Sequence, residues 1–101
     1  MKTLLNTSFF FSPSVARTVE ATLRNRWVPA CNAAGIAPAT CLRLPAEEGI
    51  MRLAVQTPFA SAESAEAFRS EVTEVIAAQL FNELGADAFT CFSTMMEIID
   101  L

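Results

Sequence analysis

Residues 3–11, Thr-Leu-Leu-Asn-Thr-Ser-Phe-Phe-Phe, have the feature that most constrains the fold: a strand pattern with apolar side chains on both faces. Successive side chains of a strand point to opposite faces, so Leu5 and Phe9 share one face, and Leu4 and Phe10 share the other. A strand that is apolar on both faces must be covered on both. Helices can cover one face, and we expect the second face to need a partner.

The length and composition of the chain limit the kind of protein it can be. A chain of 101 residues predicts a single domain, residues 1–101, with one core. Hydrophobic residues make up 52% of the chain, more than so small a domain easily buries, so we expect a homodimer. The net charge of -4 argues against nucleic acid as a partner, because binding to phosphates requires clustered cations.

The amino-terminal residues faintly resemble a secretory signal, because Met1 and Lys2 precede an apolar run. Polar residues 6–8 interrupt that run, and cleavage near Ala16 would remove the first strand, so we expect a cytoplasmic protein. No stretch is long enough to cross a bilayer, and no membrane partner is expected.

Cysteine and histidine usage narrows the chemistry. Cys31, Cys41 and Cys91 are odd in number and widely spaced, which is typical of reduced thiols and not of a disulfide framework. The sequence has no C-x-x-C pair and no histidine, so we expect neither a metal site nor a cofactor. Histidine and tyrosine are both absent, a hydrolytic triad is excluded, and no catalytic residue is identified.

Two helical patterns cover most of the remaining apolar residues. Ser12 followed by Pro13 predicts a capped helix start. The first apolar stripe is Val15, Val19, Leu23 and Trp27. Pro29 lacks a backbone donor, which predicts a break between Arg26 and Pro29, and Gly35 predicts the end. The second pattern spans residues 61–84 and ends at Gly85.

The other segments read as strands. Residues 39–44 and 50–57 alternate and flank Pro45-Ala-Glu-Glu-Gly49, which predicts a hairpin. The side of this hairpin that faces the helices is expected to carry Leu42, Leu44, Met51, Leu53 and Val55. Residues 89–99 predict a last strand, again with apolar groups on both faces.

The resulting order, β-α-β-β-α-β, predicts a ferredoxin-like α+β fold, in which a four-stranded antiparallel sheet carries two helices on one face. We expect the helix-free face to form the dimer. Its expected residues are Leu4, Asn6, Ser8, Phe10, Arg43, Arg52, Ala54, Gln56, Phe89, Met95 and Glu97. Arg52 and Glu97 are expected to form an intersubunit ion pair there, or else a ligand clamp.

The chain also resembles domain-of-unknown-function family 4286, a family of short bacterial proteins. The residues that carry the resemblance are Val28-Pro29, Gly35, Ala54-Val55-Gln56, Phe89, Phe92, Thr94 and Glu97. The chain departs from the pattern at Trp27, where such relatives often have His, and at Ser93, where they have Arg. The resemblance implies a ferredoxin-like, dimeric α/β-barrel protein and no established activity.

Two classes of function remain open. The first is a non-enzymatic homodimeric interaction or scaffold module, which accounts for the apolar excess. The alternative is a dimeric α/β-barrel protein that binds a small apolar ligand or acts as a cofactor-free oxygenase or isomerase, and it rests on fold analogy. A pocket for such a ligand could involve Trp27, although an aromatic residue at that phase is more often core. It could also involve Cys91, whose pKa a nearby Arg43 or Arg52 would lower.

Overall fold

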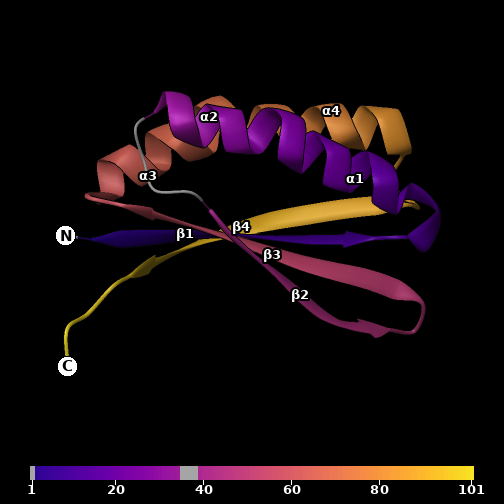
Figure 1. Ribbon diagram of the computed structural model, residues 1–101, viewed down its shortest axis with the longest axis horizontal. Helices are drawn as coiled ribbons and strands as arrows, with labels where there is room; N and C mark the ends of the chain where they lie inside the picture. The colour runs from indigo at the N-terminus through magenta and orange to yellow at the C-terminus, as the bar shows by residue number, and fades with distance from the viewer. Residues whose placement is uncertain (1, 35–38) are drawn as a thin grey trace.

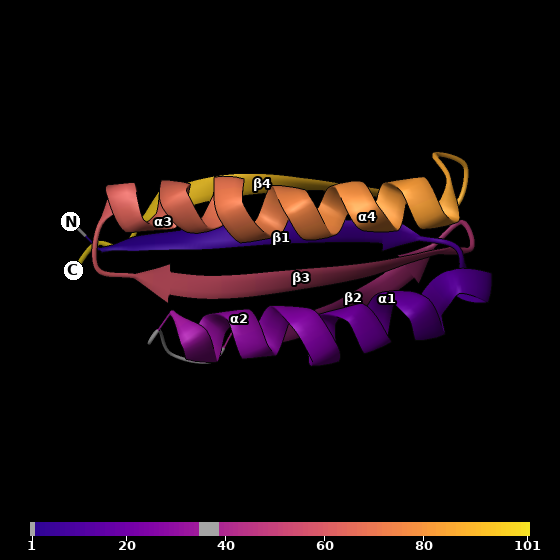
Figure 2. The same cartoon turned by 90° about the horizontal axis from the view of Figure 1, so that it is seen from above.

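The computed structural model describes residues 2–34 and 39–101. A four-stranded sheet forms one layer, and two helical stretches form a second layer over one of its faces (Figures 1 and 2). The elements are β1 (Thr3–Phe11), α1 (Ala16–Thr22), α2 (Val28–Ala33), β2 (Thr40–Glu47), β3 (Ile50–Phe59), α3 (Ala62–Phe68), α4 (Glu74–Leu84) and β4 (Phe89–Glu97). The strand order is β2-β3-β1-β4 and every pair is antiparallel, so the predicted ferredoxin-like α+β fold is confirmed.

The core lies between the sheet and the helices and is organised around β1. Burial along β1 alternates strictly, with its odd-numbered residues buried beneath the helices. The ring of Phe9 meets Trp27 edge-on at 5.8 Å, and Trp27 meets Phe68 at 5.9 Å. These contacts connect the central strand to both helical stretches, since edge-to-face aromatic pairs stabilise a core beyond the area they bury.

The first helical stretch is interrupted, as the proline predicted. A π turn at Leu23–Trp27 separates α1 from α2, and the N–H of Val28 donates to the carbonyl of Leu23, five residues earlier. The interruption begins earlier than the expected Arg26 to Pro29. A π turn is wider than an α turn, and the π turn that precedes Pro29 makes room for the proline ring. The expected end at Gly35 lies outside the described residues.

The start of this stretch differs from the prediction. Ser12 makes no side-chain cap; its backbone N–H instead donates to the carbonyl of Ala88 at 3.0 Å, and Pro13–Val15 form a 3-10 turn. Ser12 is therefore held by the loop before β4, which links the end of β1 to the second helical stretch.

The second helical stretch begins and ends near the predicted residues. The side chain of Ser61 accepts from the N–H of Ser64 at 3.1 Å, and Gly85, with a φ of 85°, closes α4. A π turn at Arg69–Thr73 divides this stretch as well. It contains neither proline nor glycine, so nothing in the local sequence predicted it.

The hairpin between β2 and β3 is tighter than predicted. β2 continues to Glu47 through an irregularity after Leu44, and Glu48 and Gly49 alone form the turn. Their φ angles are 53° and 78°, both in the left-handed region that a two-residue type I′ turn requires. Glutamate is unfavourable there, whereas asparagine and glycine are preferred.

We expect Glu48→Asn to raise the free energy of unfolding by about 0.5 to 1 kcal/mol, because asparagine tolerates a positive φ better than glutamate. Gly49→Ala should lower it by about 1 kcal/mol, purely through backbone strain, since a Cβ there would meet no atom within 4 Å. Urea denaturation at one fixed protein concentration measures both changes. Equal midpoints for the three proteins would show that the turn is not strained.

Candidate functional site

Both helical stretches lie over one face of the sheet, and no described helix covers the other face (Figure 1). Even-numbered residues of all four strands share it, because the strand registers pair even with even positions up to the irregularity after Leu44. We call this surface the open face. It consists of Leu4, Asn6, Ser8, Phe10, Thr40, Leu42, Leu44, Arg52, Ala54, Gln56, Pro58, Thr90, Phe92, Thr94 and Met96.

Much of the open face is apolar and exposed to solvent. The rings of Phe10 and Phe92 stack at 5.6 Å, and Phe92 is nevertheless 56% exposed. Leu42 and Met96 are 44% and 41% exposed at opposite edges of the sheet. Contiguous apolar surface of this kind is typical of an interaction site, because monomeric proteins seldom leave it in contact with water.

A row of polar side chains crosses the middle of the open face. Nε2 of Gln56 donates to Oδ1 of Asn6 at 3.3 Å, and Nδ2 of Asn6 donates to Oγ of Ser8 at 3.2 Å. The three side chains therefore satisfy part of one another's hydrogen-bonding capacity and remain half-buried. They divide the apolar surface of the open face into two parts.

Arg52, at one end of the open face, is bound within its own hairpin. Its Nε and Nη2 donate to the carbonyl of Pro45 at 3.1 and 2.9 Å, and its Nη1 lies 3.4 Å from Oε2 of Glu47. Glu97 lies opposite Thr3 at the other end of the sheet. Glu97 therefore lies on the helix side of the sheet, and its predicted place beside Arg52 on the helix-free face is wrong.

Seven of the eleven residues predicted for the helix-free face lie on it. They are Leu4, Asn6, Ser8, Phe10, Arg52, Ala54 and Gln56. Four belong to the opposite side of the sheet: Arg43, Phe89, Met95 and Glu97. Seven further open-face residues of β2 and β4 were missed: Thr40, Leu42, Leu44, Thr90, Phe92, Thr94 and Met96. Both strands were thus predicted one residue out of phase, which exchanges their faces.

The displaced residues have identifiable partners on the helix side. Arg43 lies opposite Leu53 and its Nη2 donates to Oε1 of Glu20 in α1 at 2.7 Å. Phe89 is buried, with its ring 6.1 Å from that of Phe9. The aromatic core contact of Phe89 favours the observed phase of β4, and the ion pair of Arg43 accompanies that of β2. Neither contact can be read from alternation alone.

Cys91 also lies on the helix side, opposite Phe9, and so does not share a face with Arg52. It lines a recess of about 210 Å³ between α4 and β4. Burial raises the pKa of the Cys91 thiol, whereas we expected a cation to lower it. Arg69, which lines the same recess, is bound by the carboxylates of Glu66 and Glu74. The thiol therefore lacks the activation that a nucleophile needs.

Trp27 does not wall a pocket in the part of the chain that the structure describes. Its side chain is 1% exposed and packs between Phe9 and Phe68. Its Nε1 has no hydrogen-bond partner among the described residues, a cost of about 1 to 3 kcal/mol for a buried donor. The core interpretation of Trp27 is confirmed.

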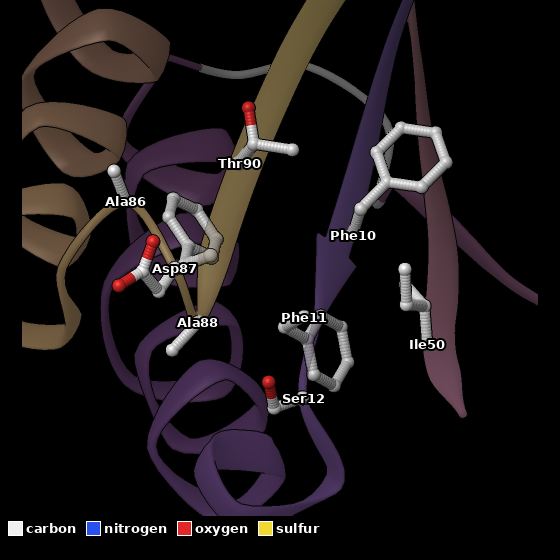
Figure 3. A pocket seen from close by; sticks show the side chains of 9 residues that line it. Phe10, Phe11, Ser12, Ile50, Ala86, Asp87, Ala88 and Thr90 are labelled. Atoms are coloured by element: carbon white, nitrogen blue, oxygen red, sulfur yellow. The ribbon is translucent and has the colours of Figure 1, made fainter. Parts of the chain in front are cut away.

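A small recess lies at the end of the sheet where β1, β3 and the loop before β4 meet (Figure 3). Figure 3 shows Phe10 and Ile50 on neighbouring strands, with Asp87 on the loop across from them. The volume is about 180 Å³. Ligand sites usually measure about 300 to 1,000 Å³, so this recess is too small for most small molecules.

Within residues 2–34 and 39–101, no group of three or more Cys, Asp or Glu side chains could hold a metal ion. None of the described helices has both the length and the hydropathy to cross a membrane.

The sheet order, the one-sided helix layer and the open face together define a protein of the ferredoxin-like α+β class. Neither a protein-family model nor a curated protein sequence matches the chain. The comparison with solved structures therefore rests on shape.

Several solved structures share this fold over nearly the whole chain. A dimeric ferredoxin-like protein from an uncultured marine organism superposes with a TM-score of 0.61 at 12% identity, covering 100% of both chains. An ethyl tert-butyl ether D (EthD) family protein from Bacillus halodurans C-125 gives 0.61 at 13% identity, covering 98% of this chain and 100% of its own. The de novo designed protein Foldit4 gives 0.65 at 8% identity, with the same coverage. At such identities the similarity establishes the fold alone.

The three thiols should react in order of exposure. Iodoacetamide at pH 7.5 should label exposed Cys41 first, partly buried Cys91 more slowly, and buried Cys31 only after unfolding. Burial raises the pKa of the Cys31 and Cys91 thiols, so labelling of Cys91 in the folded protein should accelerate only as the pH rises past about 8.5. Peptide mass spectrometry measures the rates, and the urea-unfolded chain, with equal rates, is the control.

The same shifts predict how stability depends on pH. At neutral pH the thiols are protonated in both the folded and the unfolded state, so they should not affect the free energy of unfolding. Above the unfolded thiol pKa, only the folded state still holds them protonated. The free energy of unfolding should then fall as the pH rises from about 8.5 toward the raised folded values. A stability that increases over this range would contradict the burial of Cys31 and Cys91.

Proposed function

We propose that the protein is a non-enzymatic homodimeric interaction module whose two copies pack open face against open face. The observation that carries the proposal is the exposed apolar surface around the stacked Phe10 and Phe92. Its exposure to water in a monomer is unfavourable, and a second copy offers a surface of identical size and matching chemistry.

The size of the open face supports a stable dimer. Four strands spaced about 4.8 Å apart, with about 3.3 Å per residue, give a footprint of roughly 19 by 30 Å. This planar footprint approaches the ~800 Å² that each partner of a standard interface contributes, and projecting side chains increase the accessible area further.

The polar groups of the open face are compatible with such an interface. Arg52 is already paired with Glu47 and the Pro45 carbonyl, so packing would not leave an unpartnered charge. Asn6 and Gln56 retain free donors and acceptors beyond their mutual hydrogen bond. Across a twofold axis these amides would favour one register over a slipped one.

The sequence supports an interaction role over catalysis, because it contains neither histidine nor tyrosine. We further propose membership of domain-of-unknown-function family 4286, whose members are dimeric, on the strength of the residues quoted above. One structure of similar fold is described as dimeric, which agrees with this proposal.

Three free cysteines suit a reducing compartment, and we therefore propose a location in the cytoplasm.

The dimer model predicts that Phe92→Asp dissociates the protein. Phe92 lies on the open face, where burying an unpaired carboxylate in the dimer costs several kcal/mol. The dissociation constant of the dimer should therefore rise at least a hundredfold. Sedimentation velocity at micromolar concentration measures the subunit number. The wild type should sediment as a dimer of about 22 kDa, twice the 10.9 kDa chain.

Val75→Asp is the matched control. Val75 has comparable exposure, 47%, but lies on α4 in the helix layer, so its variant should remain dimeric. Met95→Asp, which the sequence alone would have suggested, is a poorer test because Met95 lies opposite Leu5 on the helix side. A monomeric wild type would overturn the proposal, and an intact Phe92→Asp dimer would mean that another surface joins the copies.

A further inference from the structure

A cleft lies between the first helical stretch and the edge strand β2, on the helix side of the sheet. Its volume is about 340 Å³, within the range of small-molecule sites. Leu23 and Leu53, both nearly fully buried, form its apolar floor. Val28 and Cys41 stand at its sides and are exposed, so the cleft is open to solvent.

Charged side chains flank the cleft. Glu20 and Arg24 lie four residues apart on the helical stretch, with Arg43 across from them on β2. Nη2 of Arg43 lies 2.7 Å from Oε1 of Glu20, and both side chains are substantially exposed. Arg24 forms no ion pair within the described ranges. Two guanidinium groups and one carboxylate give the cleft a local charge of about +1 in a chain whose net charge is -4.

We propose that this cleft binds a small molecule that combines an apolar body with one carboxylate group. Leu23 and Leu53 would bury the body, and Arg24 and Arg43 would bind the carboxylate. The planar fork of a guanidinium matches a carboxylate with two parallel hydrogen bonds. The exposed Glu20–Arg43 pair contributes little to stability, so Arg43 can turn to a ligand at small cost.

A carboxylate is favoured over a neutral ligand because the two guanidinium groups offer only donors. It is favoured over a doubly charged phosphate because Glu20 would repel the second charge at the same mouth. The cleft and the open face lie on opposite sides of the sheet, so the site is independent of the proposed dimer.

Isothermal titration calorimetry with octanoate, and with 1-octanol as the neutral probe of the same length, tests the site. We expect octanoate to bind at least tenfold more tightly than octanol, since a charge-assisted hydrogen bond contributes about 1.5 to 3 kcal/mol. Arg24→Gln should weaken octanoate binding about tenfold and leave octanol unchanged. Glu20→Gln should tighten octanoate binding, because it removes the carboxylate that competes for Arg43.

Arg17→Gln is the control for net charge. Arg17 lines a different recess, with Thr18 of α1 and Glu83 of α4, so its loss should leave octanoate binding unchanged. Cys41→Phe places a ring in the cleft from an exposed strand position and should abolish binding of both probes. Octanoate should also protect Cys41, but not Cys91, from alkylation in the wild type.

Several results would overturn the proposal. No heat from octanoate at millimolar concentration would exclude the site, and equal binding of octanol would reduce it to an unselective apolar surface. If Arg17→Gln weakened octanoate binding as much as Arg24→Gln does, the effect would come from the overall charge of the protein and not from the cleft. Phe92→Asp should retain octanoate binding as a monomer, so failure of the dimer and failure of the ligand site are distinguishable.

Discussion

The aromatic contacts of Phe9 with Trp27, and of Trp27 with Phe68, determine which side of the sheet the helices cover. Phe9 lies at an odd position of the central strand, so every odd-numbered side chain of β1 faces the helices and every even-numbered one faces away. The antiparallel registers transfer this parity to β3 and β4, and through β3 to β2. The composition of both surfaces of the sheet follows from this one aromatic cluster.

The two proposed sites use the two sides that this parity creates. The open face is an extended surface with exposed apolar side chains, which suits a second copy of the chain. The cleft on the helix side is small and concave, and it has a buried apolar floor with cations at its mouth, which suits a small anionic molecule. The π turn at Leu23–Trp27 supplies Leu23 and Arg24 to that cleft, and π turns are frequent at functional sites.

The sequence predicted the central strand, the order of elements and the interruption before Pro29, because each depends on local spacing or on one residue's backbone chemistry. It predicted the faces of β1 and β3 correctly, since their apolar residues favour one phase. It placed β2 and β4 one residue out of phase. In β2, Leu42 and Leu44 make the wrong phase more apolar than Cys41 and Arg43, and in β4 both phases carry large apolar groups. The cleft was missed because Glu20 and Arg43 are 23 residues apart.

By itself, the sequence determined the fold class, the existence of an apolar sheet face that the helices do not cover, and the absence of histidine chemistry. These properties follow from alternation, from composition and from the residue types present. Only the tertiary structure decided which side chains of the two edge strands share that face, and which charges meet across the cleft. The physical reason is that an edge strand makes one set of backbone hydrogen bonds in either phase. Its phase is therefore chosen by long-range contacts, such as that of Phe9 with Phe89 in β4.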